Sequence, residues 1–311
     1  MPFLPVGGQA VIEGVMMRSP SSFAVAVRRG DGSIALLERP FVSITRRVRA
    51  LGLPILRGAV SLFETLGLGL TALNFSADEM VRTETGKPAK SSAALAGAQL
   101  VTLVFSLAVG VLLFIVVPAR LAAALGFHDR VRFGLVDGLF RLLAFVGYLA
   151  LISQWREMRR VLGYHGAEHK AIHALEAGVP LEPERVQTFS RFHPRCGTTF
   201  LFYVVVVSVL VFAGIGRPRG IGDHLLRIAA LPLIAGVAFE FIRLSARFGA
   251  NPVVRALTWP GLQFQRLTTR EPDLAMCAVA IAALERVRGD AQVVEAERAT
   301  SARPAEVAFI Q

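Results

Sequence analysis

SSAALAGAQLVTLVFSLAVGVLLFIVVPA, residues 91–119, is a run of 29 residues without a charged side chain or a histidine. A helix needs about 20 predominantly apolar residues to cross the hydrocarbon core of a bilayer. The whole chain has the same character, because 53% of its 311 residues are hydrophobic, only 18% are charged, and the mean hydropathy is +0.53. We therefore expect a transmembrane helix at 91–119 in an integral membrane protein, and the apolar content excludes a largely disordered chain.

Other apolar stretches predict further transmembrane helices. Asp137 and Arg141 lie inside one of them, four residues apart on one helical face, where they can neutralise each other within a bundle. Glu240 and Arg243 lie near one end of another. The three additional spans predicted are 133–155, 196–216 and 228–244.

Residues 50–76 are harder to interpret. Gly52, Pro54 and Gly58 break the start of this stretch, and charged residues interrupt the rest of it. An interfacial or re-entrant helix is favoured here over a full span. The predicted fold class is a mainly α-helical multi-pass membrane protein, with about four transmembrane helices and a small mixed α/β cytoplasmic part.

The distribution of Lys and Arg predicts the orientation. With four spans, thirteen of these residues flank the span ends on the side of both termini and the 156–195 loop. The positive-inside rule then places both termini and this loop in the cytoplasm, in a bacterial cytoplasmic membrane, whereas a fifth span at 50–76 would move the N-terminus outside. Six arginines flank the span ends on the other side: Arg120, Arg130, Arg132, Arg217, Arg219 and Arg227.

The net charge of +11 predicts a partner for the surface. No zinc-finger, RNP or basic-helix pattern accompanies the charge, so we expect anionic lipid headgroups of the bilayer and no nucleic acid. A cytoplasmic protein partner or a homo-oligomer is compatible with the sequence.

The ends of the chain read as aqueous segments. The N-terminal segment, 1–49, lacks the basic start and apolar core of a secretory signal, and residues 23–40 predict a β-hairpin around a Gly-Asp-Gly turn. The segment 250–287 contains an amphipathic helix from Glu271 to Val287. The polar, alanine-rich tail, 288–311, is expected to be disordered.

The sharpest chemical signal lies in the 156–195 loop and the residue after it. Four of the six histidines and one of the two cysteines fall between His165 and Cys196. His165 and His169 have the i, i+4 spacing that lets two imidazoles on one helix face bind one cation. His193 and Cys196 form an H-x-x-C turn that offers two more zinc ligands. We predict a divalent metal site, with zinc favoured, held by His165, His169, His193 and Cys196.

Glu168 falls beside the histidine pair, where a carboxylate could act as general acid and base on a metal-bound water. The letters H-G-A-E-H also satisfy the H-x-x-E-H pattern of inverted zinc peptidases, with Glu240 as a conceivable distant ligand, but homology to those enzymes is not favoured. The competing interpretation is a hydrogen-bonded cluster in which Glu168 pairs with Lys170 or an arginine. His173 is expected on the helix surface, and Cys277 in ordinary packing.

Four stretches taken together resemble the YqhQ-like bacterial membrane proteins, domain of unknown function 1385, over about 7–284. They are GGQAVIEGVMMR (7–18), YHGAEHK (164–170), HPRCGTTFLF (193–202) and LTTREPD (267–273), the last followed by VAIAAL. The resemblance implies a multi-pass protein of the kind described as a predicted metal-dependent enzyme, and it points to the same histidines, glutamate and cysteine. It implies no substrate, and His173 lies outside the motif.

Three functions follow as hypotheses. The leading one is a membrane metalloenzyme of hydrolase type with its site at the cytoplasmic face. Four protein ligands would favour a structural metal, so a catalytic site requires that one of the four residues does not bind the metal. The second is a non-enzymatic membrane factor whose His/Cys loop docks a partner. The third is a transporter component that uses the ionisable groups inside the membrane.

Overall fold

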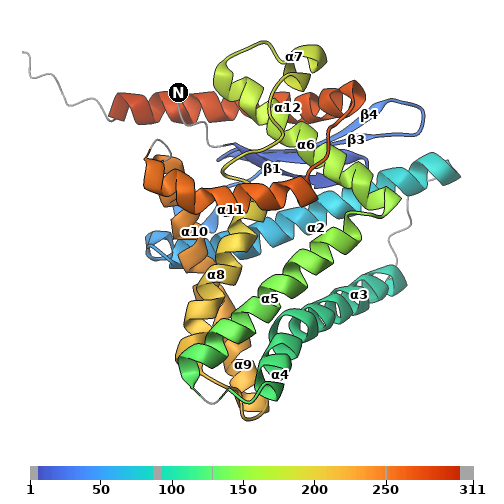
Figure 1. The fold of residues 1–311 in the computed structure, drawn as a ribbon. Coiled ribbons are helices and arrows are strands. Elements are labelled where there is room, and N and C mark those ends of the chain that lie inside the picture. Colours follow the sequence, from blue (N-terminus) through green and yellow to red (C-terminus); the bar gives the residue numbers. More distant parts are fainter. Residues whose placement is uncertain (1–5, 87–92, 128, 249–250, 302–311) are drawn as a thin grey trace, which may run out of the picture.

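The computed structural model describes residues 6–86, 93–127, 129–248 and 251–301. A small β-sheet and several helices form one end of the molecule, and long apolar helices form the other (Figure 1). The sheet is antiparallel with strand order β1-β2-β3-β4, and its strands are β1 Gly7–Val11, β2 Gly14–Arg18, β3 Ser22–Arg28 and β4 Ile34–Pro40.

The hairpin expected at 23–40 corresponds to β3 and β4, which pair with Phe23 opposite Arg39 and Val27 opposite Ala35. Alternate residues of β3 enter two different cores, as strand geometry requires. Ala24 and Ala26 face one core, and Val25 faces the other. The sheet is therefore covered on both faces, by α6 (Arg156–Ala177) and α12 (Leu274–Ser301) on one side and by α2 (Leu56–Thr85) on the other.

Five helices are long and apolar enough to cross a membrane, where the sequence predicted about four. The additional candidate is α2, which covers most of the 50–76 stretch and runs on as one helix of 30 residues. A short helix, α1 (Ile44–Arg47), and a 3-10 turn, η1 (Arg49–Gly52), precede it. The five candidates are Leu56–Thr85, Leu100–Ala124, Arg130–Ile152, Gly197–Ile215 and Ile221–Ser245.

The four predicted spans correspond to helices that begin or end a few residues from the predicted limits. The first is continuous through α3, a π-helical turn η2 and α4, and the last joins α9 to α10. Their bounds are α3 Ala93–Val111, η2 Leu112–Val116, α4 Val117–Ala124, α5 Arg130–Ile152, α8 Gly197–Ile215, α9 Ile221–Ala229 and α10 Leu231–Arg247.

The predicted pair inside α5 is confirmed, and it has a third member. An Asp137 carboxylate oxygen lies 3.0 Å from the Arg141 guanidinium and 3.0 Å from that of Arg227, which is fully buried. The last apolar helix begins at Ile221 and not at 228, so Arg227 lies within it. The sequence predicts this arginine in a loop outside the span, and its partner, 90 residues away in the chain, leaves no local signal.

The C-terminal part contains more helix than expected. Beside α12, it has α11 (Pro252–Thr268), which begins with an Asn251 cap and packs on α8. The tail expected to be disordered from 288 continues α12 as far as Ser301, and its remainder lies outside the described residues. Alanine, glutamate and arginine in this part favour helix, so nothing stops the helix where the apolar pattern ends.

Candidate metal centre

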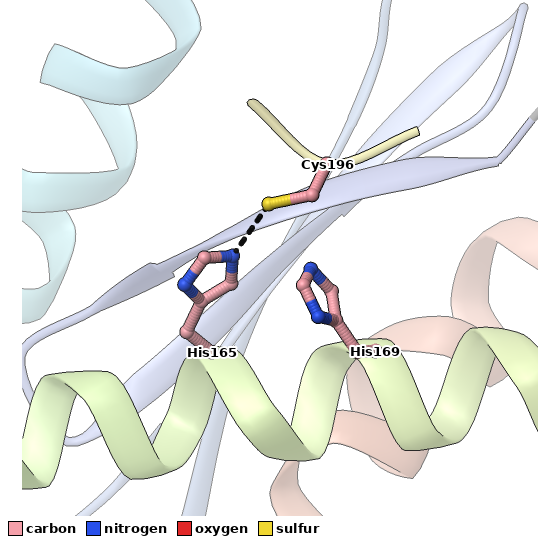
Figure 2. Close-up of side chains that lie close together, drawn as sticks. All are labelled: His165, His169 and Cys196. Atoms are coloured by element: carbon pink, nitrogen blue, oxygen red, sulfur yellow. Dashed lines mark hydrogen bonds between the residues drawn. The ribbon is translucent and has the colours of Figure 1, made fainter. Parts of the chain in front are cut away.

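Helix α6 carries three of the predicted site residues on the face toward the start of α8 (Figure 2). A close backbone approach fixes its position, because the Arg270 amide donates to the Leu162 carbonyl at 2.8 Å. A Cβ built on Gly166 would lie 2.1 Å from the Arg270 carbonyl oxygen. Only glycine fits at this point, so the G of the H-G-A-E-H stretch is a packing requirement.

His165, His169 and Cys196 converge in the fold. One ligand atom from each lies within 4.8 Å of the others, and the His165 Nε2 to Cys196 Sγ distance is 3.1 Å. Figure 2 shows the two imidazoles rising from α6 toward the cysteine. The i, i+4 histidine pair and the cysteine were predicted as ligands, and the structure brings these three together.

Backbone carbonyls set the tautomers of the two histidines. His165 Nδ1 lies 2.7 Å from the Thr268 carbonyl oxygen, and His169 Nδ1 lies 2.5 Å from that of Arg191. A carbonyl oxygen only accepts, so each Nδ1 carries a hydrogen, and Nε2 is the atom of each ring that points away from its carbonyl toward a ligand. Metal-binding histidines are oriented in this way. The His169 Nε2 atom is buried and has no hydrogen-bond partner among the described residues.

Cys196 is the N-cap of α8, and its sulfur accepts a hydrogen bond from the Thr198 amide at 3.3 Å. Burial raises the pKa of this thiol, but the neighbouring His165 and His169 outweigh that effect and lower the pKa well below its usual value. Burial likewise lowers the pKa of His165, while the Cys196 sulfur raises it, with a net result of about 9. The sulfur is therefore held as a thiolate, the form that binds metal.

Glu168 is 4% exposed and lies against the same cluster. Its Oε2 atom has no hydrogen-bond partner within the described part of the chain. Lys170, the expected alternative partner, pairs instead with Glu271 at 2.8 Å. Burial raises the pKa of Glu168. An unpaired buried carboxyl group is costly for folding and is therefore a candidate for chemistry.

The predicted fourth ligand, His193, takes a different position. Its side chain forms a second group of possible ligands with His173 and Glu176, and its Nε2 lies 3.6 Å from a Glu176 oxygen. The backbone of His193 is held by Gln265, which accepts from its amide at 2.8 Å and donates to its carbonyl at 2.7 Å. The His193 ring centre remains 5.7 Å from that of His169.

Two members of this second group, His173 and Glu176, were not predicted as ligands. His173, expected on the helix surface, is half-buried, and its Nε2 lies 2.9 Å from the Phe192 carbonyl oxygen. Glu176 also pairs with Arg195. Glu176 follows His173 by three residues on α6, so the two lie on one helix face. This spacing could have predicted Glu176 as a neighbour of the histidine. No pattern in the sequence points to Gln265.

Comparison with known proteins identifies the family of the chain. The profile of the family described as "Protein of unknown function (DUF1385)" matches residues 53–290. The chain belongs to the DUF1385 family. It is 33% identical over 295 residues to "Uncharacterized protein YqhQ" of Bacillus subtilis (strain 168), which covers 88% of this chain and 89% of that protein. No solved structure matches it.

In this DUF1385 protein the four stretches that carry the resemblance meet at one place. The α6 stretch supplies two histidines, the start of α8 supplies the cysteine, and the LTTREPD stretch supplies the Thr268 carbonyl. The N-terminal stretch packs behind them, because a Cβ built on Gly8 in β1 would lie 3.1 Å from the Glu168 carboxyl carbon.

The turn between β1 and β2 is fixed to α6. Glu13 has a positive φ of 51°, which is uncommon for a residue other than glycine. Its carboxylate pairs with Arg160 and accepts from the Tyr164 hydroxyl at 3.1 Å. The hydrogen bonds from Arg160 lower the pKa of Glu13. These contacts of the DUF1385 N-terminal stretch hold the strand that covers Glu168.

Glu240 is occupied elsewhere. Its carboxylate pairs with Arg57 and accepts from the Ile55 amide at 3.3 Å, between α10 and the start of α2. Cys277 is buried in the core shared by α6 and α12, as expected. The distant-glutamate arrangement of inverted zinc peptidases therefore has no support in this DUF1385 fold.

Proposed function

We propose that this protein is a metal-dependent enzyme of hydrolase type, embedded in the cytoplasmic membrane, with His165, His169 and Cys196 as ligands of a zinc-type ion. The observation that carries the proposal is the set of unsatisfied groups at this point. A buried imidazole lone pair on His169 and a buried carboxyl oxygen on Glu168 both lack partners among the described residues. A bound metal ion would be a partner for the His169 lone pair. It would also activate the water from which the Glu168 carboxyl group takes a proton.

Three ligands favour catalysis over a structural role. A zinc-type ion held by three protein ligands keeps one position open and supplies Lewis-acid activation of water. His193, which would have closed the set as a fourth ligand, faces Glu176 instead. The Thr268 and Arg191 carbonyls hold the two imidazoles in the orientation that a ligand needs.

Glu168 is the group that moves a proton. Its Oε2 atom would take the proton of the attacking water and return it to the leaving group. Burial raises its pKa, which favours this exchange near neutral pH. Gly8 covers the carboxyl group with backbone only, so no side chain intervenes on that side.

Packing supports four membrane spans with the site and both chain ends on one side. The sheet contacts both α6 and α12, so the three lie on the same side of a bilayer. An even number of crossings must then separate the sheet from α6. The spans α3–α4 and α5 supply two, and α2, packed along the sheet, would make the number odd. We therefore place α2 along the interface and the site at the cytoplasmic face, in keeping with the distribution of Lys and Arg.

Elemental analysis of detergent-purified protein tests the metal directly. We expect about one zinc per chain in the wild type and in Glu168→Gln, and loss of the metal in His165→Ala. Wild-type protein that is folded but takes up no zinc, even when zinc is supplied, would refute the proposal.

A second experiment tests the enzyme against the alternatives. Lipid and metabolite profiles are compared between a strain lacking the protein and strains that express the wild type or Glu168→Gln. An enzyme predicts that one compound accumulates equally in the null and Glu168→Gln strains, and that purified wild type but not Glu168→Gln converts it. A docking factor or a transporter component predicts that Glu168→Gln behaves as the wild type.

A further inference from the structure

The end of the bundle away from the His/Cys cluster contains a pocket of about 910 Å³. It lies where α4 leads into α5 and where α8 leads into α9, at the lower end of Figure 1. Its wall contains one acidic residue, Asp223. It also contains four arginines: Arg120, Arg130, Arg217 and Arg219. They are four of the six arginines on the predicted outer side, where the positive-inside rule expects few basic residues. A local function for them would explain their position.

The pocket has an excess of positive charge that the described residues do not neutralise. None of its four arginines forms an ion pair in the part of the chain that the structure describes. The Asp223 carboxylate is already engaged, because it accepts from the Arg219 amide at 2.6 Å. Like charges gathered without a counter-charge repel one another, and an anion would relieve this.

Two further polar side chains with buried atoms lie at or near the pocket, and one of them, Arg227, is cationic. His224 lines the pocket, and its Nδ1 atom is buried without a partner among the described residues. Arg227 donates to the carbonyl of Gly216, a residue of the pocket wall, at 2.9 Å. It shares Asp137 with Arg141, so this buried group of three carries a net positive charge. The α9 N-terminus opens on the same space without a side-chain cap.

We propose that this pocket binds a phosphate group, and that the phosphate belongs to the headgroup of an anionic lipid. Guanidinium groups bind phosphate oxygens in pairs, and basic pockets between transmembrane helices bind anionic headgroups. The pocket wall also includes the apolar side chains of Ile215 and Ile221, and Ile221 is 80% exposed, so an acyl chain can reach it. The inference rests on the membrane topology proposed above, and not on the metal site.

The test uses full-length protein in detergent and native mass spectrometry with added phosphatidylglycerol, phosphatidylcholine or inorganic phosphate. We expect phosphatidylglycerol to bind and phosphatidylcholine not to bind. The double variant R217Q/R219Q should bind phosphatidylglycerol at least about tenfold more weakly. R156Q/R159Q removes the same charge at the start of α6, which follows the opposite end of α5, and should bind as the wild type.

The arms of the experiment separate the outcomes. Phosphatidylglycerol binding that inorganic phosphate displaces assigns the site to a lipid headgroup, and binding of inorganic phosphate alone assigns it to the free anion. Equal binding by R217Q/R219Q and the wild type would overturn the proposal. If that variant fails to fold, R120Q/R130Q takes its place. Zinc content measured on the same samples reports separately on the His/Cys site.

Discussion

His169 and His173 lie one helical turn apart on α6, yet the structure gives them different neighbours. His169 turns toward His165 and Cys196, whereas His173 joins His193 and Glu176. Sequence spacing alone cannot separate the two histidines, because both satisfy an i, i+4 pattern. The Arg191 and Phe192 carbonyls, each bound to one imidazole, decide which ring faces which group.

Replacing each histidine by alanine tests this division. We expect His169→Ala to lose nearly all bound zinc, because it removes one of three ligands. His173→Ala should keep about one zinc per chain, because its imidazole belongs to the second group. Elemental analysis with thermal unfolding of both variants checks the prediction. Equal loss of zinc in the two would contradict the three-ligand site.

Gly166 offers a second test at this scale. Alanine there would place a methyl group 2.1 Å from the Arg270 carbonyl oxygen, so α6 would have to move away from its support. We expect the free energy of unfolding to fall by about 1–3 kcal/mol. Gly67→Ala in α2 is the matched control, because nothing lies within 4 Å of its built Cβ. A melting temperature lowered equally in both would argue against the close approach.

At the scale of the element, α5 depends on a buried ion group for its place in the bundle. Asp137 is the only carboxylate in this group within the described part of the chain, and it serves both Arg141 and Arg227. The Arg141 and Arg227 guanidinium carbons also lie 4.4 Å and 4.9 Å from the ring centre of Phe212 in α8. Charge and packing therefore tie α5, α8 and α9 together.

Removing the shared carboxylate should cost more than removing one arginine. Asp137→Asn leaves two buried cations without a counter-charge, and we expect a loss of about 3–5 kcal/mol in the free energy of unfolding. Arg227→Met leaves a neutral pair and should cost less. Denaturant unfolding in detergent measures both losses. The opposite order would mean that packing of Arg227, and not charge balance, dominates.

The same elements show what the sequence could and could not predict. Helical periodicity predicted that His165, Glu168 and His169 lie on one face of a helix, and they lie on one face of α6. Apolar runs located the four predicted spans because a bilayer requires a fixed length of apolar helix. The role of Arg227 could not be predicted, since it depends on contact with a residue 90 positions earlier. The turn of His193 toward Glu176 depends on Gln265 and on the packing of α11, which no local pattern encodes.

On the scale of the whole molecule, the sheet, α6 and α12 form a unit beside the long apolar helices (Figure 1). This unit joins the first strands of the chain to its last described helix, with all the candidate membrane helices between them in the sequence. Its integrity requires that the N-terminal sheet and the C-terminal helix share one side of the bilayer. The topology therefore has a direct experimental consequence.

Labelling with a membrane-impermeant thiol reagent tests that consequence. Asp31→Cys in the β3–β4 turn and Glu184→Cys in the short helix α7 (Pro183–Gln187) should both be protected in intact cells and labelled after lysis. Gly220→Cys, at the opposite end of the bundle, should be labelled in intact cells. Opposite behaviour of the first two variants would show that α2 crosses the membrane.

The hydrogen bond from His165 to the Thr268 carbonyl joins residues 103 positions apart, with the last two proposed spans between them. During synthesis, the ribosome makes the histidine long before the group that orients it. A nascent chain that has inserted only its first spans holds both α6 histidines without the carbonyl that fixes the first of them. If the cluster holds metal as proposed, loading is consequently a late event in biogenesis, and a chain truncated before residue 268 would lack an ordered centre.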